Sequence, residues 1–275
     1  MGEAAVHLYQ IAYSSATLAA VEPGYLVLDN LANPRPDWYE YWPIRLFLLN
    51  ETLDEAAWYG FFSPKFGAKT GLSHADVVRT VQAAAPSADV VLFSPQPDMG
   101  AFFLNVFEQG ETFDAGFIAA FEAFLRHAGQ PAELRAIVMD ARQTVFSNYF
   151  VARPAFWRAW LAIGEALFAV CEASDIEEHV ELRRALTATT SYAGAMRKVF
   201  IQERIASFLL ATQPQWRSVA ANPFAFAWSA TRFREHPVEA VISDALKTAY
   251  RDRPYPQYLH AFGRVRAIFS GKPMF

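Results

Sequence analysis

Cysteine is almost absent from this chain. Cys171 is the only cysteine among 275 residues, so an intramolecular disulfide and a cysteine-based zinc site are both excluded. The first residues, MGEAAVHLYQIAY, lack the basic start and the apolar stretch of about 7–15 residues that make a signal peptide. This pattern is typical of a first β-strand, and we expect a cytoplasmic protein.

Long uncharged apolar runs are also lacking. The longest apolar segment, Pro154 to Cys171, is interrupted by Arg158 and Glu165. A transmembrane helix needs about 18 or more consecutive, mostly uncharged apolar residues. We therefore expect no helix that crosses a membrane.

Several motifs of known chemistry are missing. The chain has no GxGxxG, GxxxxGK[ST], HExxH or GxSxG pattern. Its six histidines are dispersed without the spacing of metal ligands, so we expect no histidine metal site. These absences argue against Rossmann dinucleotide binding, P-loop nucleotide binding, zinc proteolysis and α/β-hydrolase chemistry.

The composition is that of an ordinary globular protein. With 53% hydrophobic and 19% charged residues, the chain can bury one substantial core. The net charge of −4 argues against non-specific nucleic-acid binding, which depends on lysine and arginine neutralising phosphates.

The charge is unevenly distributed. Residues 231–275 carry eight basic and four acidic side chains, a local charge of +4, so residues 1–230 carry −8. We predict a main α/β domain over residues 1–230 and a basic helical extension over residues 231–275. The extension is rich in tyrosine and phenylalanine. It could rest at the inner membrane on an anionic face, or pack its aromatic rings inward and leave a solvated basic face.

The hydrophobic pattern predicts alternating strands and helices in the first half. We expect strands at Val6–Tyr13, Trp58–Ser63, Ala88–Phe93 and Thr144–Ala152. We expect helices over residues 38–50, 74–85, 102–108, 114–128, 154–173, 193–212, 238–252 and 256–270. This order favours an α/β fold with a mostly parallel central sheet and a helical C-terminal portion.

The segment Trp58 to Leu72, WYGFFSPKFGAKTGL, carries the first candidate site. Lys65 and Lys69 lie four residues apart just after a buried strand, among glycines. Ligands bind α/β sheets at the carboxyl ends of parallel strands, and paired ammonium groups beside free backbone N–H groups suit a diphosphate. We expect these lysines in an exposed loop; the alternative is a solvated turn.

Four further groups could carry chemistry. Arg45 could hold a phosphate, or stack on an aromatic ring and pair with Asp37 or Glu40. Asp98, after the Ala88–Phe93 strand, could bind a metal or act as a base. Asn148 lies in a predicted strand. Glu203 and Arg204 are adjacent in a predicted helix, where a structural ion pair is the usual arrangement.

The order of several segments resembles a known family. IAYS near the start, NPRPDWYEYWPIR, YGFFSPKFGAKTGL, ADVVLFSP, VFEQGETFDAGF, SNYFVARPAFW and ERIASFLLA occur in this order. Over about residues 6–212, the chain resembles glycosyltransferases encoded among bacterial capsule, O-antigen and other surface-polysaccharide genes.

The resemblance implies a nucleotide-sugar-binding domain of the A-type glycosyltransferase fold. It implies that Tyr13 and Ser14 lie near the nucleotide base, that Arg45, Lys65 and Lys69 lie near the diphosphate, and that Asp98 lies near the sugar. Asn148 and Glu203 would be acceptor-side or catalytic candidates. Such enzymes commonly bind Mn²⁺ or Mg²⁺ through Asp-x-Asp, but the matching loop here is SPQPD with Asp98 alone, so dependence on Mn²⁺ or Mg²⁺ stays open.

We therefore expect a glycosyltransferase that moves a sugar from a nucleotide-sugar donor to a bacterial surface-glycan acceptor. If Arg45, Lys65 and Lys69 converge, they can stabilise the departing diphosphate, with Asp98 or Glu203 as the base of an inverting reaction. A retaining reaction stays open. The alternative is a non-catalytic glycan- or partner-binding module that stacks sugars on Trp38, Tyr39, Tyr41 and Trp42, although such aromatics are more often in the core.

Overall fold

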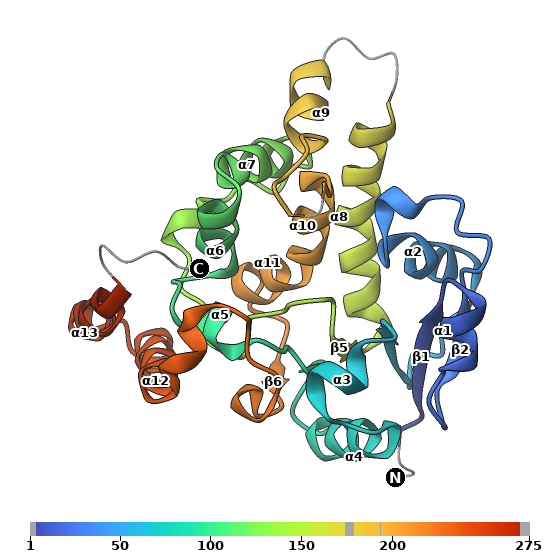
Figure 1. Cartoon of the computed structure of the whole chain (residues 1–275), viewed down its shortest axis with the longest axis horizontal. Coiled ribbons are helices and arrows are strands. Elements are labelled where there is room, and N and C mark those ends of the chain that lie inside the picture. The colour runs from blue at the N-terminus through green and yellow to red at the C-terminus, as the bar shows by residue number, and fades with distance from the viewer. Residues whose placement is uncertain (1–3, 174–178, 193, 270–275) are drawn as a thin grey trace.

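The protein folds around a six-stranded mixed sheet (Figure 1). The computed structural model describes residues 4–173, 179–192 and 194–269. The strands lie in the order β2-β1-β3-β5-β4-β6. They are β1 (Val6–Ala12), β2 (Leu26–Asp29), β3 (Trp58–Phe62), β4 (Val90–Leu92), β5 (Phe150–Ala152) and β6 (Ser218–Ala220). The prediction of an α/β fold is confirmed.

The prediction of a mostly parallel sheet is wrong. β1 runs parallel to β2 and β3, and β4 runs parallel to β6, but β5 is antiparallel to both β3 and β4. All three residues of β5 are buried. A strand that is covered on both faces has a continuous apolar sequence whether it is parallel or antiparallel to its neighbours. The sequence pattern therefore predicted a strand here without its direction.

Alternate residues of the strands enter two hydrophobic layers. In β4, Val90 and Leu92 face the layer that contains α2 (Tyr41–Asn50) and α8 (Pro154–Glu172), whereas Val91 faces α4 (His74–Ala84). Each central strand is thus covered by helices on both faces, as its continuous apolar sequence requires.

Ten further α-helices complete the described part of the chain. They are α1 (Ser15–Ala19), α3 (Phe66–Thr70), α5 (Pro97–Ala101), α6 (Val106–Phe113), α7 (Phe117–His127), α9 (Val180–Leu186), α10 (Arg197–Glu203), α11 (Ile205–Thr212), α12 (Pro237–Asp252) and α13 (Pro256–Arg266). The predicted helix over 193–212 is two helices separated at Arg204, and residue 193 lies outside the described residues. The predicted helix over 102–108 is wrong, because Asn105 caps α6 instead and the helix starts at Val106.

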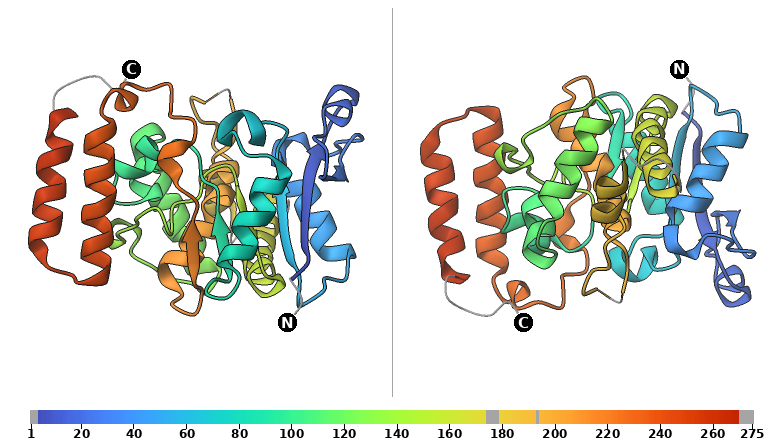
Figure 2. Two further views of the ribbon diagram at one scale, coloured as in Figure 1. Left: turned by 90° about the horizontal axis from the view of Figure 1, so that it is seen from below. Right: turned by 90° about the horizontal axis from the view of Figure 1, so that it is seen from above.

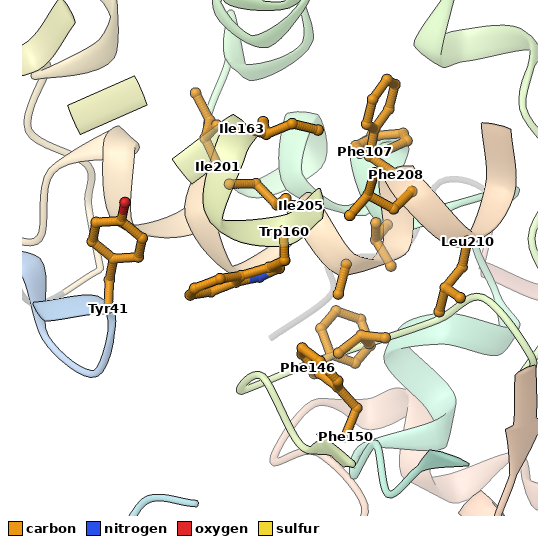
Figure 3. Packing of buried hydrophobic residues seen from close by; sticks show 14 of the residues in the cluster. Tyr41, Phe107, Phe146, Phe150, Trp160, Ile163, Ile201, Ile205, Phe208 and Leu210 are labelled. Atoms are coloured by element: carbon orange, nitrogen blue, oxygen red, sulfur yellow. The ribbon is translucent and has the colours of Figure 1, made fainter. Parts of the chain in front are cut away.

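Helix α8 packs through the middle of the larger layer. Figure 3 shows Trp160 and Ile163 of this helix gathered with side chains from α11 and from the segment around β5. Gly164 lets the Tyr41 ring approach closely, since a Cβ at this position would lie 2.7 Å from Tyr41 Cε2. The Tyr41 hydroxyl then donates to Glu165 at 2.9 Å.

By length and composition alone, α8 is long and apolar enough to span a membrane, whereas the sequence analysis expected no such helix. Half of its 18-residue apolar window is buried inside the fold, against α2, α9, α10 and α11. Its two central charges are paired, Arg158 with Glu55 and Glu165 with Arg45. A core helix passes the same length and composition test, and these contacts are those of a core helix.

Helices α12 and α13 lie side by side at the end of the molecule opposite β1 and β2 (Figure 2). Lys247 of α12 is fully buried and donates to the carbonyl oxygens of Gly100 at 2.7 Å and Phe103 at 2.8 Å. Asp244 accepts from the Ala141 backbone N–H at 2.8 Å. Part of the predicted basic extension is therefore joined to the α/β body by buried polar contacts.

Candidate functional site

The carboxyl ends of β1 and β3 form the edge where a ligand site is expected. From β1 the chain passes through α1 to β2 on one side, and then through α2 to β3 on the other side (Figure 1). The strand order therefore reverses between β1 and β3, and crevices at such reversals are the usual ligand sites of open α/β sheets. Tyr13 and Ser14 follow β1 here, and Lys65 and Lys69 follow β3.

The two lysines differ in their surroundings. Lys65 is exposed at the start of α3, whereas Lys69 is half-buried and donates from Nζ to Ser147 Oγ at 2.9 Å. Lys69 Nζ also lies 5.4 Å from the centre of the Tyr149 ring. Burial lowers the pKa of Lys69, Glu203 and Glu40 act to raise it, and Lys65 acts to lower it further. The prediction of an exposed loop is wrong for Lys69, because residues 66–70 form a short helix that packs through the buried Phe66.

A strained turn precedes β5 and faces Lys69. Ser147 and Asn148 both have left-handed backbone conformations, with φ values of 60° and 53°. The Tyr149 N–H donates to the Phe146 carbonyl at 3.2 Å, as in a turn of the type I′ class. The sequence pattern predicts Asn148 inside a strand. The structure instead places it in a turn before β5. Strain of this kind at non-glycine residues is concentrated at functional sites.

Asn148 and Gln202 form a buried amide pair. Asn148 Nδ2 donates to Gln202 Oε1 at 3.1 Å, and both residues are at most 3% exposed. Asn148 Oδ1 and Gln202 Nε2 have no hydrogen-bond partner among the residues that the structure describes. The pair ties the strained turn to the end of α10. Buried polar atoms without partners are costly, so their presence here is a second signal of a site built for something other than stability.

Glu203 is the last residue of α10, where the helix breaks before α11. Its half-buried carboxyl makes no hydrogen bond or ion pair with the described residues. Burial raises the pKa of Glu203 to about 7, and Glu40 contributes in the same direction, while Arg204 and Lys69 act to lower it. A carboxyl with a pKa near neutrality is suited to general acid–base catalysis.

The predicted ion pair between Glu203 and Arg204 does not form. Arg204 is buried and turns toward α6, where Nε donates to the Val106 carbonyl at 2.9 Å and Nη2 donates to Gln109 Oε1. Burial lowers the pKa of Arg204 to about 10. Arg204 therefore fixes the break between the two helices and makes no hydrogen bond to the Glu203 carboxyl.

A cluster of charges holds α10 in place. Lys198, near the start of this helix, lies 2.5 Å from Asp37 and 4.2 Å from the centre of the Trp38 ring. Arg35 joins Asp37 at 3.0 Å and Glu172 at 2.6 Å. The segment NPRPD therefore fixes the direction of the helix that ends at Glu203.

Arg45 and Asp98 lie apart from this group and have structural partners. Arg45 makes a two-pronged pair with Glu165, at 2.5 and 2.8 Å, and lies 4.2 Å from the centre of the Phe168 ring. It thus stacks and pairs as one of our alternatives predicted, but its partner is neither Asp37 nor Glu40. Asp98 is fully buried and accepts from the backbone and the hydroxyl of Ser229.

The structure therefore brings together Tyr13, Lys65, Lys69, Asn148 and Glu203 from different segments. Burial raises the pKa of Tyr149, and Glu40, Glu203 and Tyr13 act in the same direction, so Tyr13 lies near this group. Ser14 follows Tyr13 but caps α1, where its hydroxyl accepts from the Thr17 N–H.

Sequence reasoning missed Gln202, and it considered Glu40 only as a partner of Arg45. A glutamine inside an apolar helix and a glutamate beside aromatic residues are common. Only the tertiary fold brings Gln202 to Asn148 and Glu40 to Lys69 and Glu203.

No group of three or more histidine, cysteine, aspartate or glutamate side chains is arranged as a metal site among the residues that the structure describes. A separate polar hollow of about 550 Å³ lies at the amino end of β6, lined in part by Arg142, Trp216 and Arg251. Comparisons with protein-family models, curated proteins and solved structures found no match for this chain.

Proposed function

We propose that this chain is a glycosyltransferase that moves a sugar from a nucleotide-sugar donor to a surface-glycan acceptor. One observation carries the proposal: a carboxyl without a hydrogen-bonding partner among the described residues and a pair of lysines meet where the strand order reverses, joined through the turn of Ser147 and Asn148. Transfer from a nucleotide sugar needs cations for the departing diphosphate and, in an inverting reaction, a base for the acceptor hydroxyl.

In this proposal, Lys65 and Lys69 bind the donor diphosphate. Glu203 removes the proton from the acceptor hydroxyl as its oxygen attacks the anomeric carbon of the sugar. The bond from that carbon to the diphosphate oxygen breaks, and the nucleoside diphosphate leaves with the added negative charge beside the lysines. Arg45 and Asp98 have no part in these steps, because their side chains are bound to Glu165 and Ser229. Whether donor binding needs Mn²⁺ or Mg²⁺ is tested in the binding experiment below.

The alternative of a sugar-stacking module has less support. It depended on Trp38, Tyr39, Tyr41 and Trp42, but Trp38 and Tyr41 are at most 1% exposed, and Trp42 packs near Phe168. Of the four, only Tyr39 presents its ring to solvent, with 48% exposed. A single exposed ring gives no extended stacking surface.

We further propose a cytoplasmic location with peripheral contact to an anionic membrane through the C-terminal helices. Support comes from Arg234, Arg253 and Arg264, which are exposed. Lys247 is buried, and Arg266 pairs with Glu108 at 2.8 Å. Lys272 lies outside the described residues. Co-sedimentation with anionic vesicles should weaken when the three exposed arginines are changed to glutamine; equal sedimentation would contradict this contact.

Donor binding is the first test of the proposed function. The protein is heated with UDP, GDP, CDP, dTDP and their sugars, each with and without Mn²⁺ or Mg²⁺. A ligand at 100 times its dissociation constant stabilises the folded state by about 2.7 kcal/mol, so one nucleotide should raise the Tm selectively.

Lys65→Glu tests the diphosphate contact without disturbing the fold, because Lys65 is exposed. We expect it to reduce the affinity for the stabilising nucleotide, whereas the matched reversal Arg253→Glu, on the exposed surface after α12, should leave it unchanged. Lys69→Met tests the second lysine without placing a new charge beside Glu203. Folded variants with unaltered affinity would remove the diphosphate role of these lysines.

A further inference from the structure

Tyr39 has a backbone conformation that tyrosine rarely adopts. Its φ and ψ angles are 46° and −132°, and those of Glu40 are −65° and −22°. These values match the two central positions of a type II′ turn, whose first position strongly favours glycine. A bulky residue there is a genuine outlier, and its backbone is strained.

The strain is not explained by packing of the side chain. The Tyr39 ring is 48% exposed and makes no aromatic contact or hydrogen bond with the described residues. The adjacent Trp38 and Tyr41 rings are buried in the core. The turn thus presents one aromatic ring to solvent while its two neighbours anchor the segment on either side.

The turn lies beside the candidate site. Its segment packs on the helix that ends at Glu203, where Lys198 lies 2.5 Å from Asp37 and 4.2 Å from the centre of the Trp38 ring. Glu40, the next residue after Tyr39, acts on the pKa of both Lys69 and Glu203. Burial raises the pKa of Tyr149, and Glu40 and Tyr13, which is 44% exposed after β1, act in the same direction. Tyr13 and Glu40, the residue that follows Tyr39, therefore lie near the group that contains Lys69.

We propose that Tyr39 is a stacking platform for the nucleobase of the donor, held in a strained turn beside the lysines that bind the diphosphate. This inference rests on the proposed function. A planar base joined to a diphosphate needs an exposed aromatic face near paired cations, and base–aromatic stacking tolerates any base. Glycine at position 39 would relieve the backbone strain of the turn, but it would remove the aromatic ring.

The test compares two probes, the nucleoside diphosphate that stabilises the wild type and inorganic pyrophosphate, which has no base. Tyr39→Ala should weaken nucleoside diphosphate binding by roughly 5- to 150-fold, the range expected for loss of one base–aromatic contact. Its affinity for pyrophosphate should stay unchanged. Tyr39→Phe should bind both probes like the wild type, and so should Tyr255→Ala, which removes another exposed tyrosine far along the chain.

Tyr39→Gly adds a readout that a purely structural role would not give. It should raise the Tm of the free protein, because glycine favours this turn position, while weakening nucleoside diphosphate binding as Tyr39→Ala does. Equal nucleoside diphosphate affinity in Tyr39→Ala and the wild type would overturn the inference and leave the proposed function standing. A parallel loss of pyrophosphate binding would also overturn it, since the ring would then act through the lysines. A folded wild type that binds no nucleotide would overturn both.

Discussion

Replacing Glu203 by glutamine should make the protein more stable and less active at the same time. Burial raises the pKa of this carboxyl to about 7 from its ordinary value of 4.5. At 1.36 kcal/mol for each pKa unit, this difference corresponds to about 3 kcal/mol. It is an upper limit, because part of the side chain is exposed and solvent screens it.

The direction in which stability changes with pH follows from proton binding to Glu203. Between pH 4.5 and 7, the unfolded chain holds fewer protons on Glu203 than the folded protein, so the wild type loses stability as the pH rises. Glutamine has no charge to bury. Glu203→Gln should therefore exceed the wild type by up to about 3 kcal/mol above pH 7, and the gain should fall toward zero below pH 4.5.

Urea unfolding at a series of pH values measures this difference directly. Glu235→Gln is the matched control, because Glu235 is exposed, and its stability should follow the wild type at every pH. A Glu203→Gln curve parallel to that of the wild type, or a variant that is less stable at pH 8, would refute the reasoning. In a donor-transfer assay the same variant should lose about 10²–10⁴-fold in rate, as expected when a general base is removed.

Three further changes test the structural framework. Gly164→Ala should destabilise the protein by about 1–3 kcal/mol in urea unfolding, because the new Cβ meets the Tyr41 ring; an unchanged midpoint would contradict the close contact. Arg45→Met should cost about 1–3 kcal/mol, because Glu165 loses its ion partner and keeps only the Tyr41 hydroxyl and solvent, yet it should leave nucleotide affinity unchanged; lost affinity in a folded variant would restore a ligand role for Arg45. Lys247→Ala should cost about 3 kcal/mol or more, since it opens a cavity and leaves two carbonyl oxygens without donors; a cost below about 1 kcal/mol would argue against these contacts.

The fold was predictable where a local pattern determines it. The helix expected over residues 74–85 is α4, which begins after a capping box of Ser73 and Asp76, and α8 begins and ends within one residue of its predicted bounds. The strands β2 and β6 were missed, because β2 is largely exposed, β6 has only three half-buried residues, and neither has a clear apolar pattern.

The site was predictable as separate pieces and not as an arrangement. Lys65 and Lys69 could be recognised because they follow a buried strand, which is a local signal. The nearness of Glu203 to Lys69 could not be, because it depends on how α10 packs and on the break at Arg204. Asp98 follows a buried strand just as the lysines do, but Ser229, from a distant segment, takes its carboxylate.

Hydrogen–deuterium exchange with the stabilising nucleoside diphosphate tests the central claim most directly, because it locates the ligand on the chain. The account predicts slower exchange in residues 62–71 and 145–149, which surround Lys69, and no change in α12. Protection confined to the residues around the hollow of Arg142 and Arg251, with none near Lys69, would place the nucleotide at the other edge of the sheet and contradict the proposed site.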